Sequence, residues 1–132
     1  MSELSIKDKT AIVGIGETRY YKRGAAPTPE FQLALEAILL AIEDAGLKVE
    51  DIDGFASYSN DRNDPTRIAA ALGLPSIGFS NMFWGGGGGG GWGAVGNAAA
   101  AVAAGYAKYV VAYRSLAQGQ FGRFGVAAPI QT

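Results

Sequence analysis

Seven consecutive glycines, at residues 85–91, occupy the middle of the chain and are flanked by Trp84 and Trp92. Glycine lacks a side chain, so its backbone can adopt conformations and close approaches that other residues cannot. Residues 94–104 follow at once and are almost all alanine, glycine or valine, which predicts an α-helix with little polar surface. The tryptophans and the helix favour an ordered, closely packed turn, although glycine runs are also typical of flexible linkers.

The segments around this turn alternate between helical patterns and short apolar runs. Thr28 as N-cap and Pro29 in the first turn predict the start of a helix, and Gly46 predicts its end. Asp64 and Pro65 predict the start of a second helix. Apolar or β-branched runs predict four strands, at residues 10–16, 54–59, 77–81 and 106–113.

Strands that alternate with helices over short links predict an α/β domain, with a mostly parallel sheet covered by helices on both faces. The length of 132 residues fits a single domain, residues 1–132. The helix at residues 94–104 has no polar face to offer water, so we expect it to be buried between layers of a larger body. The chain is therefore expected to be a fragment or one subunit of an assembly.

Composition excludes several classes of chemistry. The chain has no cysteine and no histidine, so disulfides, thiol catalysis, Ser-His-Asp catalysis and the usual zinc sites cannot come from this chain alone. A formal net charge of -1 argues against nucleic acid as a partner. No window has the ~20 apolar residues of a membrane span, and the first ten residues lack the apolar core of a signal peptide. We expect a cytoplasmic protein with no membrane span.

Other candidate sites carry weaker signals. Gly14 and Gly16 follow a predicted strand as in dinucleotide-binding loops, but Arg19 stands where that motif needs a third glycine. The glycine run lacks the Gly-Lys-Ser/Thr ending of a Walker loop. A basic and aromatic loop at residues 20–23 could touch a phosphate or be a plain surface loop. Three acidic residues are interpreted as solvated charges or helix caps: Asp44, Asp61 and Asp64.

The stretch at residues 88–113, G-G-G-G-W-G-A-V-G-N-A-A-A-A-V-A-A-G-Y-A-K-Y-V-V-A-Y, resembles the nucleophile loop, buried helix and next strand of thiolases. In that family the loop reads C-x-S-G and a small-residue helix leads to G-x-A-x-x-V. The segments A-I-V-G-I-G-E-T at residues 11–18 and D-I-D-G-F-A at residues 51–56 are similar to the lipid-transfer-protein (SCP-x-like) branch. The resemblance covers about residues 10–125 and implies a thiolase-like layered fold, of which this chain is the amino-terminal part.

Counting back from Gly105, the resemblance places the family's cysteine on Gly88 and its Ser-Gly glycine on Gly91. Glycine cannot form the acyl-enzyme thioester of classical thiolases. The resemblance implies instead that the backbone N–H of Gly88 faces the thioester carbonyl of an acyl-CoA. We expect the substrate to contact residues around this position and at the end of the fourth strand: Gly85, Gly86, Gly87, Gly89, Gly90, Gly91, Trp84, Trp92 and Arg114.

A branch without the cysteine resembles aldolases that cleave coenzyme A thioesters of steroid side chains with the help of a small OB-fold partner protein. The resemblance implies coenzyme A as part of the substrate, no covalently bound cofactor, and acid and base residues outside this chain. It also implies a homodimer that pairs through the third strand, near residues 79–81. Two alternatives stay open: a thiolase-like acyltransferase with a nucleophile from elsewhere, and a non-catalytic lipid-binding or scaffolding subunit.

Overall fold

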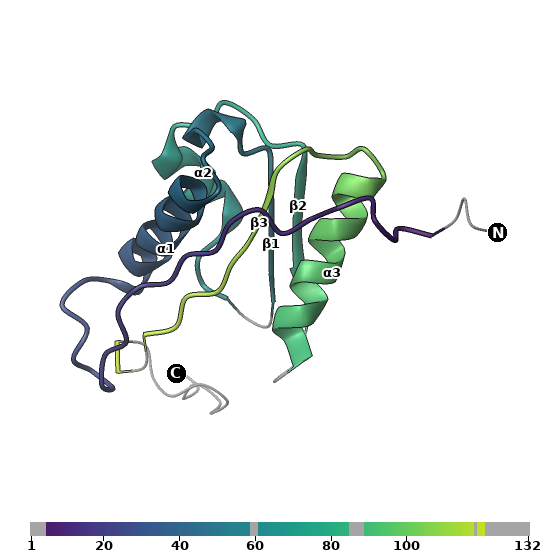
Figure 1. The fold of residues 1–132 in the computed structure, drawn as a ribbon. Coiled ribbons are helices and arrows are strands. Elements are labelled where there is room, and N and C mark those ends of the chain that lie inside the picture. Colours follow the sequence, from purple (N-terminus) through teal and green to yellow (C-terminus); the bar gives the residue numbers. More distant parts are fainter. Residues whose placement is uncertain (1–4, 59–60, 85–88, 118, 121–132) are drawn as a thin grey trace, which may run out of the picture.

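Strands and helices alternate along the chain in the computed structural model, which describes residues 5–58, 61–84, 89–117 and 119–120 (Figure 1). The strands are β1 (Gly54–Tyr58), β2 (Phe79–Phe83) and β3 (Val110–Ala112). The α-helices are α1 (Glu30–Asp44), α2 (Pro65–Leu72) and α3 (Gly90–Ala103), and a short 3-10 turn covers Val49–Asp51. No helix in this described part combines the length and the apolar character that a membrane crossing needs.

The three strands form one parallel sheet in the order β2-β1-β3. Gly54 at the start of β1 is in register with Phe79 of β2 and with Val110 of β3. The first four residues of β1 are buried, as expected for the central strand of a parallel sheet. The predicted α/β class with a parallel sheet is therefore confirmed, in the form of a small sheet.

The two faces of the sheet are covered by different helices. Phe55 of β1 is fully buried in a cluster with apolar residues of α1 and α2, and its ring meets the Tyr113 ring edge-on, with centroids 6.2 Å apart. The next residue, Ala56, points to the other face and packs against Ala94 and Ala98 of α3. Figure 1 shows α1 and α2 on one side of the strands and α3 on the other.

The first helix begins later than its sequence signals predict. Pro29, with φ −59° and ψ 150°, precedes the first helical residue, and the buried Thr28 hydroxyl has no hydrogen-bond partner among the described residues. The extended conformation of Pro29 places the helix start at Glu30, so the expectation that Thr28 is the N-cap is wrong. Gly46 ends the helix as predicted, with a left-handed φ of 69°.

The third and fourth strands also differ from their predicted limits, and Asp53 explains both shifts. Its carboxylate accepts hydrogen bonds from the N–H groups of Lys108 and Tyr109, at 2.8 Å each, so the chain before β3 is tied in a loop. Its carbonyl oxygen accepts the N–H of Gly78 at 2.6 Å, just before β2 begins. The fourth strand is therefore shorter than residues 106–113, and the third lies two residues beyond 77–81.

The run at residues 10–16 does not form a strand, contrary to prediction. Gly14 and Gly16 lie against the backbone of α1, so closely that an added Cβ would be 2.5 Å from the carbonyl oxygens of Ala41 and Ala37 respectively. The N–H of Ile15 donates to Asp44 at 2.9 Å. The β-branched run fits a strand by composition, but its glycines allow a close approach to a helix, and that contact prevails.

Asp64 caps α2 as predicted, and this cap gives a first testable result. Its Oδ1 accepts from the N–H and the hydroxyl of Thr66, both at 2.7 Å, and these bonds hold the pKa of Asp64 below its ordinary value of 3.8. A lowered folded-state pKa contributes stability above pH ~4 that is lost as the pH falls through that pKa. Asp64→Ala is expected to lower the free energy of unfolding by about 1 kcal/mol at neutral pH.

Asp64→Asn is the matched variant, because asparagine is an equally good N-cap that does not titrate. Urea unfolding of the complete protein at pH 7 and pH 3 measures the effect. The free energy of unfolding of the wild type is expected to exceed that of the Asn variant by less at pH 3 than at pH 7. An unchanged difference between the two pH values would show that the carboxylate does not act through its charge.

Candidate functional site

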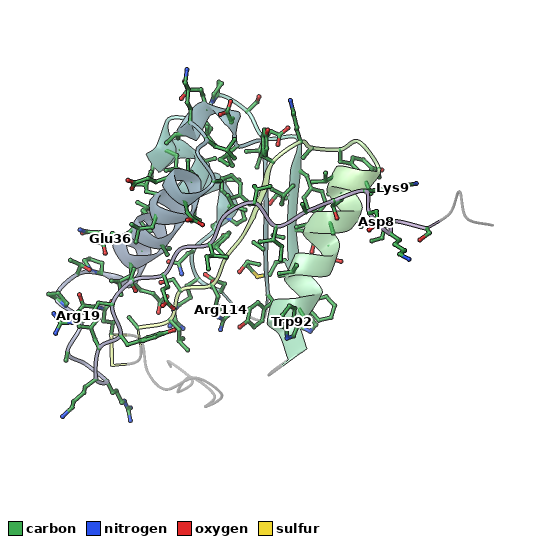
Figure 2. All side chains as sticks on the ribbon, viewed as in Figure 1. Asp8, Lys9, Arg19, Glu36, Trp92 and Arg114 are labelled. Carbon is green, nitrogen blue, oxygen red and sulfur yellow. The ribbon has the colours of Figure 1, made fainter. Side chains whose placement is uncertain are left out.

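The carboxyl ends of the three strands meet at one edge of the sheet, because the strands are parallel. Open α/β sheets commonly bind ligands at this edge. β1 ends here at Tyr58, α3 begins here at Gly90, and Arg114 follows β3 by two residues. Trp92 and Arg114 lie at the same end of the molecule, the lower end in the view of Figure 2.

The start of α3 is seated on two aromatic rings. Gly90 is buried against Tyr58, and a Cβ at this position would lie 2.8 Å from Cγ of that ring. One turn later, a Cβ on Gly93 would lie 3.1 Å from Cδ1 of Phe83, the last residue of β2. Close packing therefore requires glycine at residue 90, and at residue 93 a larger side chain would make a tight contact with the Phe83 ring. The reading of the whole glycine run as a linker is wrong for residues 90 and 91, which are helical.

The helix start presents polar backbone to this edge. The first N–H groups of an α-helix have no partner within the helix, and the helix dipole favours negative charge there. Gly89 is the N-cap and offers no side-chain cap, and Gly91 has no side chain to cover the N–H groups. Such a start can hold an anion or a developing oxyanion.

Arg114 is placed at this edge but is held by protein groups. Its guanidinium donates to the carbonyl oxygen of Tyr58 and lies over the Tyr58 ring, 4.8 Å from the ring centre. Its Nε is 3.9 Å from Asp61 Oδ2, and the Arg114 side chain is 16% exposed. This residue fixes the end of β1, and its expected contact with substrate stays a prediction.

The remaining predicted site residues divide into two groups. Trp84 and Trp92 lie at this edge of the sheet and are 79% and 78% exposed, so their rings are accessible. Four glycines lie outside the described residues, including the position matched to the family's cysteine: Gly85, Gly86, Gly87 and Gly88. Their expected roles stay predictions.

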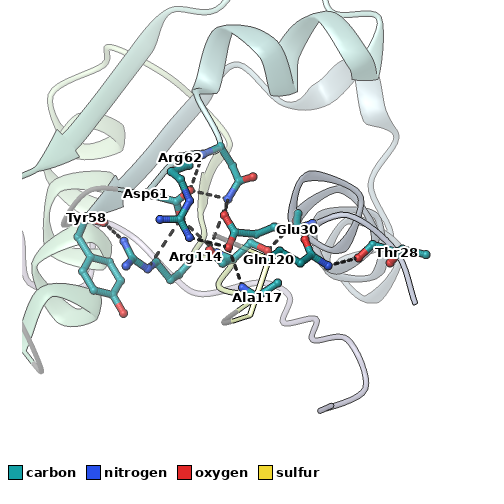
Figure 3. A network of polar contacts seen from close by, with 10 residues as sticks. Thr28, Glu30, Tyr58, Asp61, Arg62, Arg114, Ala117 and Gln120 are labelled. Carbon is teal, nitrogen blue, oxygen red and sulfur yellow. Dashed lines mark hydrogen bonds and ion pairs between the residues drawn. The ribbon is translucent and has the colours of Figure 1, made fainter. Parts of the chain in front are cut away.

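A buried polar network beside this edge was missed in the sequence (Figure 3). Glu30, 1% exposed, begins α1 and accepts hydrogen bonds from Arg62 at 3.1 Å and from the N–H of Ala117 at 2.7 Å. Its carbonyl oxygen accepts the Ser115 hydroxyl at 2.8 Å. Glu30 therefore joins α1 to the loop after β1 and to the segment after β3.

Asp61 is the second carboxylate of this network, and its interpretation as a solvated charge is wrong. It is 7% exposed and accepts from the backbone and side chain of Asn63, both at 2.7 Å, and from the N–H of Ser115 at 3.1 Å. The Tyr113 hydroxyl donates to the carbonyl oxygen of Asn63. Burial, and secondarily the charge of Asp61, raises the pKa of Tyr113, which keeps this hydroxyl a neutral donor.

The other candidate sites gain no support from their surroundings. Gly14 and Gly16 face α1, so their backbone is engaged by that helix. In the basic and aromatic loop, the Tyr20 hydroxyl donates to Glu17 at 2.8 Å and the Tyr20 side chain is 84% exposed. Among the described residues, no three metal-binding side chains are grouped so that they could hold an ion.

Comparison with known proteins identifies several relatives. The chain is 39% identical over 121 residues to the 17-hydroxy-3-oxo-4-pregnene-20-carboxyl-CoA lyase of Mycobacterium tuberculosis, a match that covers 91% of this chain. It is 40% identical over 117 residues, 88% of this chain, to the steroid side-chain-cleaving aldolase of Thermomonospora curvata. The chain is similar to steroid side-chain-cleaving aldolases. No family model matches it.

A solved structure agrees with these sequence matches. The chain superposes on a chain of an Ltp2-ChsH2(DUF35) aldolase with a TM-score of 0.75 and 37% identity, over 89% of its own length. The matches cover 30% and 29% of the two relatives and 29% of the solved chain. The chain thus spans slightly less than a third of the length of each relative.

Proposed function

We propose that this chain is the amino-terminal part of an acyl-CoA aldolase, a lyase that breaks a carbon–carbon bond of a bulky, steroid-like coenzyme A thioester. The observation that carries the proposal is the 39% and 40% identity, over most of this chain, to two relatives named for such cleavage. The glycine-rich start of α3 at the carboxyl edge of the sheet supplies a chemical role for the chain.

The proposed reaction is a retro-aldol cleavage. A base removes the proton of the β-hydroxyl group, the bond between Cα and Cβ breaks, and the β-carbon becomes a ketone. The electron pair forms the enolate of the shortened thioester, which then takes a proton at Cα. We assign the stabilisation of the enolate oxygen to backbone N–H groups at the start of α3, with Gly88 as the position matched to the thiolase cysteine. The acid and base belong to the part of the protein beyond this chain.

The finer affiliation is with the thiolase superfamily, in the lipid-transfer-protein branch, with the layered fold of that family. Retro-aldol cleavage forms no covalent adduct with the enzyme, so it needs no cysteine, and this chain has none. An acyltransferase would need a nucleophile from outside the chain. The absence of cysteine therefore supports the lyase over the acyltransferase.

The proposed assembly has two kinds of partner. One is a small OB-fold protein, and the presence of a second protein is supported by the ChsH2(DUF35) component named in the solved relative. A second copy of the complete protein pairs through β2, which lies at an edge of the described sheet and has β1 as its neighbour there. An open strand edge can be covered by dimerisation. The substrate is an acyl-CoA, and no covalent cofactor is involved.

Turnover by the complete protein, purified with its OB-fold partner, tests this function. The substrate is a steroid whose side chain is a β-hydroxyacyl-CoA thioester. Mass spectrometry follows the small-molecule products and the mass of the intact protein. We expect one ketone and one shortened acyl-CoA per substrate, with no mass gain on the enzyme. Cleavage through an acyl-protein adduct would contradict the proposal in favour of an acyltransferase, and binding without turnover would favour a lipid-binding subunit.

A further inference from the structure

Tyr58 stands between the sheet and the start of α3. It ends β1, is half-buried, and its ring fills the space in which Gly90 would otherwise carry a side chain. Three ring carbons lie within 3 Å of an ideal Cβ built on Gly90, and two ring carbons and the hydroxyl oxygen of Tyr58 lie 3.8 to 4.0 Å from the equivalent point on Gly91. The first turn of α3 thus rests on this ring.

The position of the ring is itself fixed from the other strand. Arg114 donates to the carbonyl oxygen of Tyr58 and places its guanidinium 4.8 Å from the ring centre. The arginine is in turn 3.9 Å from Asp61, a buried carboxylate that also binds Asn63 and Ser115. Contacts therefore run from the buried network through Arg114 to Tyr58 (Figure 3), and the Tyr58 ring in turn lies against Gly90 at the helix start.

We infer that Tyr58 is a positioning residue that sets the location of the α3 start, and that it acts through its flat ring rather than its hydroxyl. The inference rests on the proposed function, because it assigns the helix start to the enolate oxygen. Because the Tyr58 ring already contacts Gly90, the helix start cannot move closer to β1. Because the contact leaves no gap, the first turn of α3 has a single packed position. Loss of that ring frees the first turn to shift.

A shift of the N–H donors lowers the rate more than the affinity. The donors interact most strongly with the oxygen as it gains charge, so their displacement weakens transition-state binding more than substrate binding. Displacements of about 1 Å can cost ~100-fold in rate. Because a helix held elsewhere by Ala94, Ala98 and Ala101 moves less freely, we expect a kcat loss of about tenfold for Tyr58→Leu, with little change in KM.

The test uses three variants of the complete protein with its partner: Tyr58→Leu, Tyr58→Phe and Tyr106→Leu. The phenylalanine variant keeps the ring and is expected to retain kcat. Tyr106 is 68% exposed and precedes β3, at the opposite edge of the sheet, so its leucine variant is the matched control. Wild-type kcat in Tyr58→Leu would overturn the inference. An equal loss in Tyr58→Phe would also overturn it, because the hydroxyl would then act directly.

Hydrogen exchange separates failure of this inference from failure of the proposed function. The amides of residues 94–97 donate to the carbonyl oxygens of the first turn of α3. Faster exchange at these amides is expected in Tyr58→Leu and not in Tyr58→Phe, whatever reaction the assembly performs. If the wild type cleaves no thioester yet the exchange changes as expected, the proposed function fails and the seating role of Tyr58 stands. If the wild type cleaves the thioester and exchange is unchanged in Tyr58→Leu, the positioning role fails. Tyr58→Met replaces the leucine variant if that protein does not fold.

Discussion

Gly90→Ala is expected to lower kcat of the complete enzyme by about 100-fold, because the new methyl group would displace the start of α3. The methyl carbon would lie 2.8 Å from Cγ of Tyr58, and two other carbons of the ring would also be closer than 3 Å. Neither partner can yield easily, because the ring is held by Arg114 and the helix is packed on the sheet. Steady-state kinetics of coenzyme A thioester cleavage measures the loss.

Gly96→Ala is the matched control for this change. Gly96 lies in the same helix on its exposed side, and no atom of the residues that the structure describes lies within 4 Å of an added Cβ there. Alanine is a better helix former than glycine, so this variant is expected to gain about 1 kcal/mol in free energy of unfolding and to keep wild-type kcat. Full activity in Gly90→Ala, or an equal loss in Gly96→Ala, would contradict the seating of α3 described above.

A double variant tests the specific contact. In a Tyr58→Ala background the space that the ring occupies is empty, so the methyl group at residue 90 has room. Gly90→Ala should therefore lower kcat by a much smaller factor in that background than in the wild type. Effects that simply multiply would show that the two residues are independent.

Glu30→Ala is expected to lower the free energy of unfolding of the complete protein by about 3 kcal/mol. The substitution removes a buried carboxylate and leaves the N–H of Ala117 without its acceptor. It also removes one partner of Arg62, whose side chain is 42% exposed and can turn to water. The expected loss therefore lies at the lower end for a broken buried ion pair. Urea unfolding measures it.

Glu43→Ala is the control, because Glu43 lies on the same helix with an exposed side chain. Its expected effect is within about 0.5 kcal/mol. Hydrogen exchange locates the damage in Glu30→Ala: the amide of Ala117 should exchange faster, since it donates to Glu30. Equal stability of the two variants would contradict the structural role given to Glu30.

The local elements could be predicted where their signals lie in adjacent residues. Asp64 followed by Pro65 marks the start of α2, and Gly46 marks the end of α1, because caps depend on neighbouring backbone groups. The alternation of predicted strands and helices was enough to predict the α/β class and the parallel sheet. The limits of β2 and β3 depend instead on Asp53, whose partners lie up to 56 residues away.

In the candidate site, too, features set by adjacent residues could be predicted and features set by distant residues could not. The glycine run and the helix after it could be found in the sequence, because small residues in series are visible there. The seat of α3 could not, because it depends on a ring at residue 58 that meets Gly90 from another strand. Glu30 reads as an ordinary first-turn acid, and its burial follows from partners 32 and 87 residues away. Proline directly before it and a polar loop at residues 61–64 are the signals that hint at this network.

A structure of the complete protein with its partner and a non-cleavable acyl-CoA analogue tests the central claim most directly. The thioester oxygen is expected within about 3 Å of a backbone N–H at the start of α3, with the Tyr58 ring packed against that turn. A thioester bound far from the glycine run, with Trp84 and Trp92 covered by another part of the protein, would contradict it.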